Sequence, residues 1–261
     1  MGAALFIAHP AHELRLHAWL SRTRAEVHVL TTGSRSGEGT ERLEATGRLL
    51  DGLGCPRGRV FGACLDRELY AALLAGEHAG FHAVADALRD ALAVRAAGLL
   101  VVDAWQLYSP AHDLAHLIGR AAAAEAGVLL GRPVDVRELA VVPEPAGHAA
   151  DSLVLRLSVA EAEARRAAAD AHPGIEAELA EALAVGGAEA LAAEAMCRPP
   201  PLAELPPSDG QPPLYERFGE ARVRSGLYGE VLRWRHMAPV FDAFARRIGE
   251  AGELAPARRA G

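Results

Sequence analysis

Hydrophobic and polar positions alternate between two patterns over the first 160 residues of the chain. Short apolar runs, of the kind that form buried strands, occupy residues 3–8, 26–32 and 98–104, and the last of these is the strongest. A briefer strand is predicted at Val60 and Phe61, and further strands at 134–142 and 152–158. Between them, helical spacing of apolar residues predicts helices at 14–21, 40–53, 77–95 and from His112 to about residue 126.

This alternation of strands and helices predicts an α/β fold, a three-layer sandwich with a mainly parallel Rossmann-like sheet and C-terminal helices. Later in the chain, segments 161–171 and 175–195 are rich in Ala and Glu and are predicted to be helices. A Pro-rich stretch over 198–213 predicts an extended linker. We therefore expect an α/β domain over 1–197, the linker, and a helical segment over 214–261 that packs on the same domain.

Composition narrows the range of partners. The chain of 261 residues is 51% hydrophobic and carries 27 basic against 34 acidic side chains, for a net charge of −7, with no basic run. Nucleic acid and anionic membrane surfaces are therefore poor partners. Neither an apolar stretch long enough to span a bilayer nor a secretory signal pattern is visible, so the expected location is the cytoplasm. A homo-oligomer is compatible with the sequence.

Two residue types limit the chemistry. The sequence contains no Lys, which excludes a phosphate-loop lysine, a Schiff-base lysine and a lysine general base. Its 3 cysteines lie far apart and form no pair typical of a zinc site. Any bound metal must therefore be held by histidines and carboxylates.

Histidines gather after two of the predicted strands. His9 and His12 follow the first strand, and His112 and His116 lie in the loop and helix after the strand at 98–104. Because ligands of parallel sheets bind outside the carboxyl ends of the strands, these residues are candidates for a three-nitrogen zinc site. Spacing alone also fits capping, surface or core histidines. His148, in a loop after a predicted strand, is a further candidate outside this group.

The segment from Leu5 to Glu13 (LFIAHPAHE) resembles the first motif, A-H-P-D-D-E, of the LmbE-like or PIG-L zinc-dependent de-N-acetylases. The segment Ser109 to His112 (SPAH) is similar to the family's second motif, H-P-D-H, which also follows a strand. The resemblance covers about residues 3–175, but only these two turns are specific. It implies zinc (or another divalent metal) as cofactor, with His9, His12 and His112 at the metal-binding positions; His12 stands where the family has Asp.

The chain departs from this pattern at the positions for proton transfer. Ala11 replaces the family's general base, and Ser109 replaces its general acid. Either another titratable group has taken over this work, or the site no longer hydrolyses amides. The replacement candidates are Glu13, Asp113 and His116, each of which also has a structural interpretation as a helix-end carboxylate or a packed histidine.

Four further residues near the two turns are candidates for substrate contacts: Arg15 for an anionic group, Asp103 at the end of its strand, and Trp105 and Tyr108 as a wall for a sugar ring. The resulting hypothesis is a metal-dependent hydrolase that removes the acyl group from an N-acylated sugar or sugar-containing metabolite. The alternative is a non-hydrolytic descendant that keeps the metal and binds a sugar or a partner protein. A domain without metal is a third interpretation.

Overall fold

A computed structural model of the chain describes residues 2–33, 40–142, 151–176, 179–180, 191–208 and 210–254. Its centre is a sheet of five strands in the order β3-β2-β1-β4-β5, with all neighbouring strands parallel. The strands are β1 (Gly2–Ile7), β2 (Glu26–Thr31), β3 (Arg57–Cys64), β4 (Ala97–Asp103) and β5 (Asp135–Leu139). The chain runs outward from β1 through β2 to β3 and then returns to place β4 on the other side of β1. The strand order thus reverses between β1 and β4, where parallel sheets bind their ligands.

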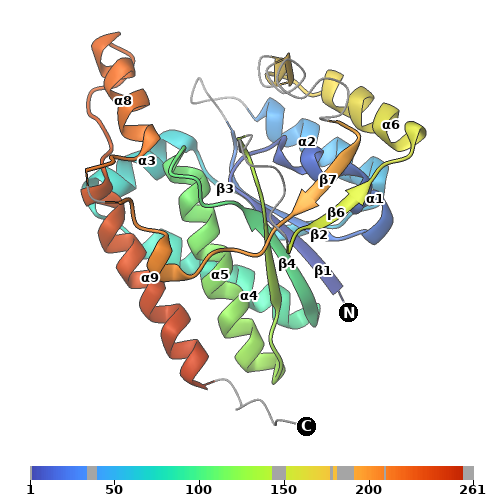
Figure 1. The fold of residues 1–261 in the computed structure, drawn as a ribbon, viewed down its shortest axis with the longest axis horizontal. Coiled ribbons are helices and arrows are strands. Elements are labelled where there is room, and N and C mark those ends of the chain that lie inside the picture. The colour runs from blue at the N-terminus through green and yellow to red at the C-terminus, as the bar shows by residue number, and fades with distance from the viewer. Residues whose placement is uncertain are drawn as a thin grey trace.

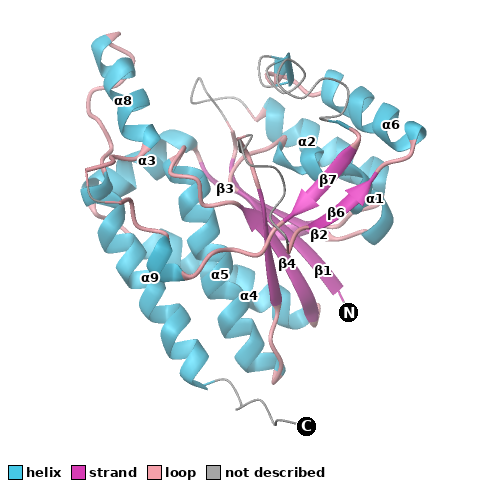
Figure 2. Ribbon diagram, viewed as in Figure 1, coloured by secondary structure: helices cyan, strands magenta, loops and turns pink. Residues whose placement is uncertain are grey.

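Helices cover both faces of the sheet, which confirms the predicted three-layer α/β class (Figures 1 and 2). One face carries the 3-10 helix η1 (His12–Leu16), α1 (His17–Thr23) and α2 (Glu41–Leu53), and α6 (Val159–Asp170) lies beside α1. The other carries α3 (Asp66–Ala75), α4 (Ala79–Val94) and α5 (Pro110–Leu130). Alternate residues of β1 explain this arrangement, because Phe6 packs into one core and Leu5 and Ile7 into the other.

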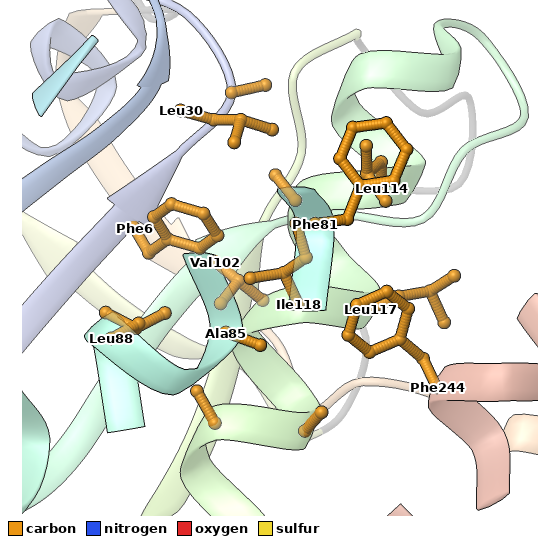
Figure 3. Packing of buried hydrophobic residues seen from close by; sticks show 14 of the residues in the cluster. Phe6, Leu30, Phe81, Ala85, Leu88, Val102, Leu114, Leu117, Ile118 and Phe244 are labelled. Carbon is orange, nitrogen blue, oxygen red and sulfur yellow. The ribbon is translucent and has the colours of Figure 1, made fainter. Parts of the chain in front are cut away.

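The core beneath α4 and α5 is built from Phe6, Val102, Ile118 and their neighbours (Figure 3). Helix α5 approaches the sheet closely at Gly119, where an added Cβ would lie 2.4 Å from a methyl carbon of Val102. Pro110 opens the helix at its first turn, and Gly131 ends it in the left-handed conformation. This close packing fixes the first turn of α5, and therefore His112, above the end of β4.

The C-terminal helix α9 (Trp234–Leu254) packs on the α/β domain. Helix α9 packs against α5 through Val240 and Phe244, and α8 (Leu214–Arg224) lies at the upper left of Figure 1. Between β7 (Ala193–Met196) and α8, the Pro-rich segment contains the short 3-10 helix η3 (Leu202–Glu204). Its Leu205 is buried, and the Leu205 carbonyl accepts a 2.7 Å hydrogen bond from Nε1 of Trp105. The Pro-rich segment therefore packs against the α/β domain at Leu205.

The structure also corrects parts of the predicted element map. Residues 193–195, predicted as the end of a helix, belong to strand β7 (Ala193–Met196), which pairs antiparallel with β6 (Leu153–Arg156). Helix α3 was not predicted, and the brief strand at Val60 is the eight-residue β3. In its described part, the predicted helical segment over 214–261 contains two helices, α8 and α9, and the helix predicted over 14–21 is η1 followed by α1. Parts of the predicted helix at 175–195, and His148, lie outside the described residues. Among the helices that are described, none has the length and apolar character needed to cross a membrane.

Candidate metal centre

The three predicted ligand histidines come together where the strand order reverses. His9 follows β1, His12 opens η1, and His112 lies in the first turn of α5, just beyond β4. The turn between the first two passes through Ala11, which has a φ of 84° and so adopts the left-handed conformation that costs an alanine about 1 kcal/mol or more. The Ala11 N–H donates to Oγ1 of Thr46 in α2 at 3.3 Å, which helps to hold this turn.

The three imidazole rings contact one another edge to face. Their centroids are separated by 5.5 Å between His9 and His12, 5.1 Å between His9 and His112, and 4.8 Å between His12 and His112. Three imidazoles bound to one tetrahedral zinc through bonds of about 2.0–2.1 Å would have centroids about 5 Å apart. The ring spacing therefore suits a single metal ion.

A carboxylate holds the Nδ1 side of two of these rings. Nδ1 of His9 lies 2.9 Å from Oδ1 of Asp66, at the start of α3, and 2.9 Å from Oγ1 of Thr31. Nδ1 of His12 lies 2.9 Å from Oδ2 of Asp103. An ionised carboxylate can only accept, so each ring carries its proton on Nδ1 and keeps the lone pair of Nε2. This is the arrangement by which outer carboxylates orient metal-binding histidines.

His112 differs, because its Nδ1 is buried and has no hydrogen-bond partner among the described residues. A buried imidazole nitrogen without a partner is costly unless a ligand satisfies it, and a metal ion would do so. In the described part of the chain, however, no group of three or more His, Cys, Asp or Glu side chains already meets the geometry of a metal site. The rings are correctly spaced, but at least one must rotate before three nitrogens face a common point.

Electrostatics favour the neutral imidazole at His12 and at His112. Burial lowers the pKa of His12, although Asp103 opposes the shift. Burial lowers the pKa of His112 well below its ordinary value, and the neighbouring His12 and His9 lower it further. Arg15 also lowers the pKa of both rings through its charge, which places this predicted anion contact near the centre.

Glu13, a predicted proton-transfer residue, is fully buried, and its Oε1 accepts a 2.7 Å hydrogen bond from Oγ1 of Thr46. Burial raises its pKa to about 7, against hydrogen bonds that lower it. Nε2 of His172, at the end of α6, lies 3.2 Å from the same Thr46 hydroxyl. Glu13 in this conformation braces the turn between β1 and α1 against α2.

The other two predicted proton-transfer residues also make internal contacts. Oδ1 of Asp113 accepts hydrogen bonds of 3.2 Å from the backbone N–H groups of Gln106 and Leu107, and burial raises its pKa to about 8. Nδ1 of His116 donates to the Asp103 carbonyl at 3.1 Å, and its Nε2 lies 3.5 Å from Nη1 of Arg120. Burial lowers the pKa of His116 to about 3, so the ring is neutral. Both nitrogens of His116 are engaged away from the three-histidine cluster.

The predicted substrate contacts fall in different places. Asp103 is fully buried and also accepts a 2.7 Å hydrogen bond from the Ala8 N–H, so it supports His12 and has no surface of its own. Trp105 packs against Trp234 and Phe241 of α9. Tyr108 remains at the centre, stacked on His112 with ring centroids 6.2 Å apart.

Sequence reasoning missed Asp66 and Thr31, the two side chains that hold His9. The available signal was the position of Asp66 directly after a strand of the parallel sheet, at the first residue of a helix. The pKa of Asp66 lies below its ordinary value, because the hydrogen bonds from His9 and Thr31 outweigh the opposite effect of burial. It is therefore an anion beside His9.

Comparisons with known proteins support the fold. The conserved protein TT1542 from Thermus thermophilus, known from a crystal structure, is similar over 77% of this chain and 95% of its own, with 20% sequence identity and a TM-score of 0.51. At this identity the similarity bears on the fold alone, and it agrees with an α/β sandwich around a parallel sheet. No model of a known protein family matches the chain, and no curated protein matches it.

Proposed function

We propose that this protein is a metal-dependent hydrolase that removes the acyl group from an N-acylated sugar or a sugar-containing metabolite. The observation that supports it best is the cluster of His9, His12 and His112 at the reversal of strand order, with ring spacing that suits one metal ion. The proposal also draws on the resemblance of the two histidine turns to the LmbE-like de-N-acetylases. Zinc is the metal that best matches three imidazole nitrogens.

Some residues of the chain would bind the metal ion, and others orient the histidine rings that bind it. Nε2 of His9 and Nε2 of His12 are the donor atoms available for the metal, because Asp66 and Asp103 hold the opposite side of each ring. On the third ring the available donor is the buried Nδ1 of His112, which has no hydrogen-bond partner in the described part of the chain. A bound zinc ion would supply an activated water and polarise the acyl carbonyl. In this proposal Arg15 binds an anionic group of the substrate and Tyr108 contacts a sugar face.

Hydrolysis also needs a proton acceptor for the attacking water and a donor for the leaving amine. Glu13 and Asp113 adjoin the ligands in sequence and are the proposed acceptors, and His116 is the proposed donor. Because the pKa of Asp113 is raised to about 8 and that of His116 is lowered to about 3, Asp113 must first release a proton and His116 must first take one up. Each must first leave its present partner: the Thr46 hydroxyl for Glu13, the backbone N–H groups after β4 for Asp113, and the Asp103 carbonyl for His116. The hydrolase proposal therefore includes a local rearrangement of at least one of these groups.

Those internal contacts favour a second candidate function, metal binding without hydrolysis. Ala11 and Ser109 stand where the similar family has its base and acid. Loss of an acid and a base costs an otherwise unchanged enzyme about 10²–10⁴-fold in rate for each group. A non-hydrolytic protein would keep the three histidines and bind a sugar or a partner at the same place.

Acetate release separates the two candidates. Zinc-loaded protein is incubated with N-acetylglucosamine conjugates, alongside His112→Ala and the control His236→Ala, which removes a histidine from α9. The hydrolase proposal expects acetate from the wild type and the control but not from His112→Ala. Release by none of the three, with zinc bound to the wild type, would favour the non-hydrolytic candidate.

Paired variants then identify the proton-transfer group. Glu13→Gln or Asp113→Asn should reduce turnover by about 10²-fold or more with little change in zinc content if that carboxylate transfers a proton. If both variants alter only the thermal midpoint, the two carboxylates have structural roles and the proposed mechanism is wrong.

A further inference from the structure

An aromatic surface continues from the metal centre onto α8. Tyr108 stacks on His112, and the ring of Phe218, in α8, meets Tyr108 with centroids 5.3 Å apart at an angle of 71°. The two rings thus form a corner whose inner end adjoins a proposed metal ligand. No residue of α8 belongs to the motifs that suggested the metal site.

Phe218 is 45% exposed, although large apolar side chains are usually buried. Leu214, one helical turn before Phe218 on α8, is also exposed, at 41%. Exposed apolar residues at the edge of a site are typical of surfaces that bind a ligand or partner.

The exposure of Phe218 does not come from a loosely attached helix. Glu216 is buried and accepts hydrogen bonds from the Trp234 N–H at 2.8 Å and from Nη1 of Arg233 at 2.9 Å. Tyr215 is also buried, and its N–H donates to the Leu107 carbonyl at 3.3 Å. The inner side of α8 is therefore anchored to α9 and to the loop after β4, while Phe218 is held in solvent beside Tyr108.

A cavity lies on the same part of the molecule. It has a volume of about 640 Å³ and is lined in part by Leu107, Leu214 and Arg217. Leu107 immediately precedes Tyr108, and Leu214 and Arg217 belong to the first turn of α8, next to Phe218. Neither Tyr108 nor Phe218 lines this cavity, so it adjoins the ring pair only through their neighbours in the chain.

From this geometry we infer that Tyr108 and Phe218 form a subsite for an aryl group attached to the substrate of the metal centre. Two rings at a steep angle offer one face and one edge, so a third ring can pack against both in offset or edge-to-face contact. The two rings carry no charge, so an anionic group of the substrate is assigned to Arg15 instead. This inference rests on the proposed function, and it narrows the substrate class to acylated amino sugars with an aromatic aglycone.

The test compares phenyl and methyl N-acetyl-β-glucosaminide, which share the sugar and the acyl group. Affinities are measured by calorimetry with zinc-loaded wild type, Phe218→Ala, and the control Leu129→Ala, which truncates an exposed leucine at the far end of α5. We expect the wild type and the control to bind the phenyl compound at least about tenfold more tightly than the methyl compound. In Phe218→Ala, the two affinities should become nearly equal.

Equal affinities in the wild type, a preference that survives in Phe218→Ala, or binding of neither compound would each overturn the aryl subsite. These outcomes are distinct from failure of the metal centre, which would appear as absent zinc before any glucosaminide is added. Circular dichroism of Phe218→Ala checks that α8 still folds. Tyr108→Phe, which keeps the ring, should retain the preference and provides a second variant that does not depend on truncation.

Discussion

Replacing Asp66 with Asn tests whether the outer carboxylates prepare the histidines for metal. In the wild type, Oδ1 of Asp66 lies 2.9 Å from Nδ1 of His9, with the carboxylate side chain 20% exposed. The amide keeps the size of the side chain but loses its charge, so it orients His9 less firmly and makes the imidazole a weaker donor. Loss of such a partner costs about 10–100-fold in metal affinity. We therefore expect Asp66→Asn to weaken zinc binding by this factor, about 1.4–2.7 kcal/mol.

Stability should change much less. Asp66 is an acidic residue in the first turn of α3, where a negative charge contributes about 0.3–1 kcal/mol. Glu41→Gln is the matched control, because Glu41 occupies the first turn of α2 and is not among the residues that contact the histidines. The assay is a zinc titration against a competing chelator, with urea unfolding of the metal-free proteins. If Asp66→Asn bound zinc as tightly as the Glu41→Gln control, the reasoning about outer carboxylates would be refuted.

Three further predictions concern the turn and the core. Ala11→Asp restores a carboxylate at the left-handed turn position and should raise the rate of acetate release by about 10²-fold with zinc content unchanged. An equal rate at full zinc occupancy would count against a hydrolytic metal centre at the three histidines. Gly119→Ala should lower the free energy of unfolding by about 1 kcal/mol or more because its Cβ meets Val102, whereas Gly80→Ala, with open space around it, should not; equal urea midpoints would contradict the close approach of α5. Burial lowers the pKa of His28 from 6.5 to about 4, so the unfolded chain binds a proton at this residue at a higher pH than the folded chain does. Stability therefore falls as the pH decreases from 6.5 towards 4. Between pH 7.5 and 4.5, urea unfolding should show that the wild type loses about 2–3 kcal/mol more free energy of unfolding than His28→Leu does.

The parts of the fold that sequence could predict are those whose pattern is set by burial on both faces. Strands β1 and β4 are central in the sheet, so their continuous apolar runs are visible in the sequence. Strand β3 lies at the edge and contains arginines and two glycines, and only its two central apolar residues signalled a strand. The sequence of β7 predicts a helix because alanine and glutamate favour helices. Its pairing with β6 overrides that preference.

The candidate site divides in the same way. The resemblance of the two turns to the LmbE-like motifs predicted His9, His12 and His112 as one set. Both turns follow central strands, β1 and β4, whose ends the topology brings side by side. Asp66 was missed because its partner is 57 residues away and no local pattern marks their contact. Trp105 was predicted to contact substrate, but its indole donates to a carbonyl 100 residues further along, in the Pro-rich segment. Such contacts are decided by how distant segments pack, which spacing within one segment does not record.

Zinc stoichiometry is the most direct test of the metal centre. The full chain is stripped with a chelator, loaded with zinc, desalted and analysed for metal per polypeptide, in parallel with His112→Ala and the histidine control His236→Ala. We expect about one zinc per chain in the wild type and in His236→Ala. We expect a large loss in His112→Ala, because the His112 ring centroid lies 5.1 Å from that of His9 and 4.8 Å from that of His12. A wild type that retains no zinc, or a His112→Ala variant that retains as much as the wild type, would contradict the proposed three-histidine centre.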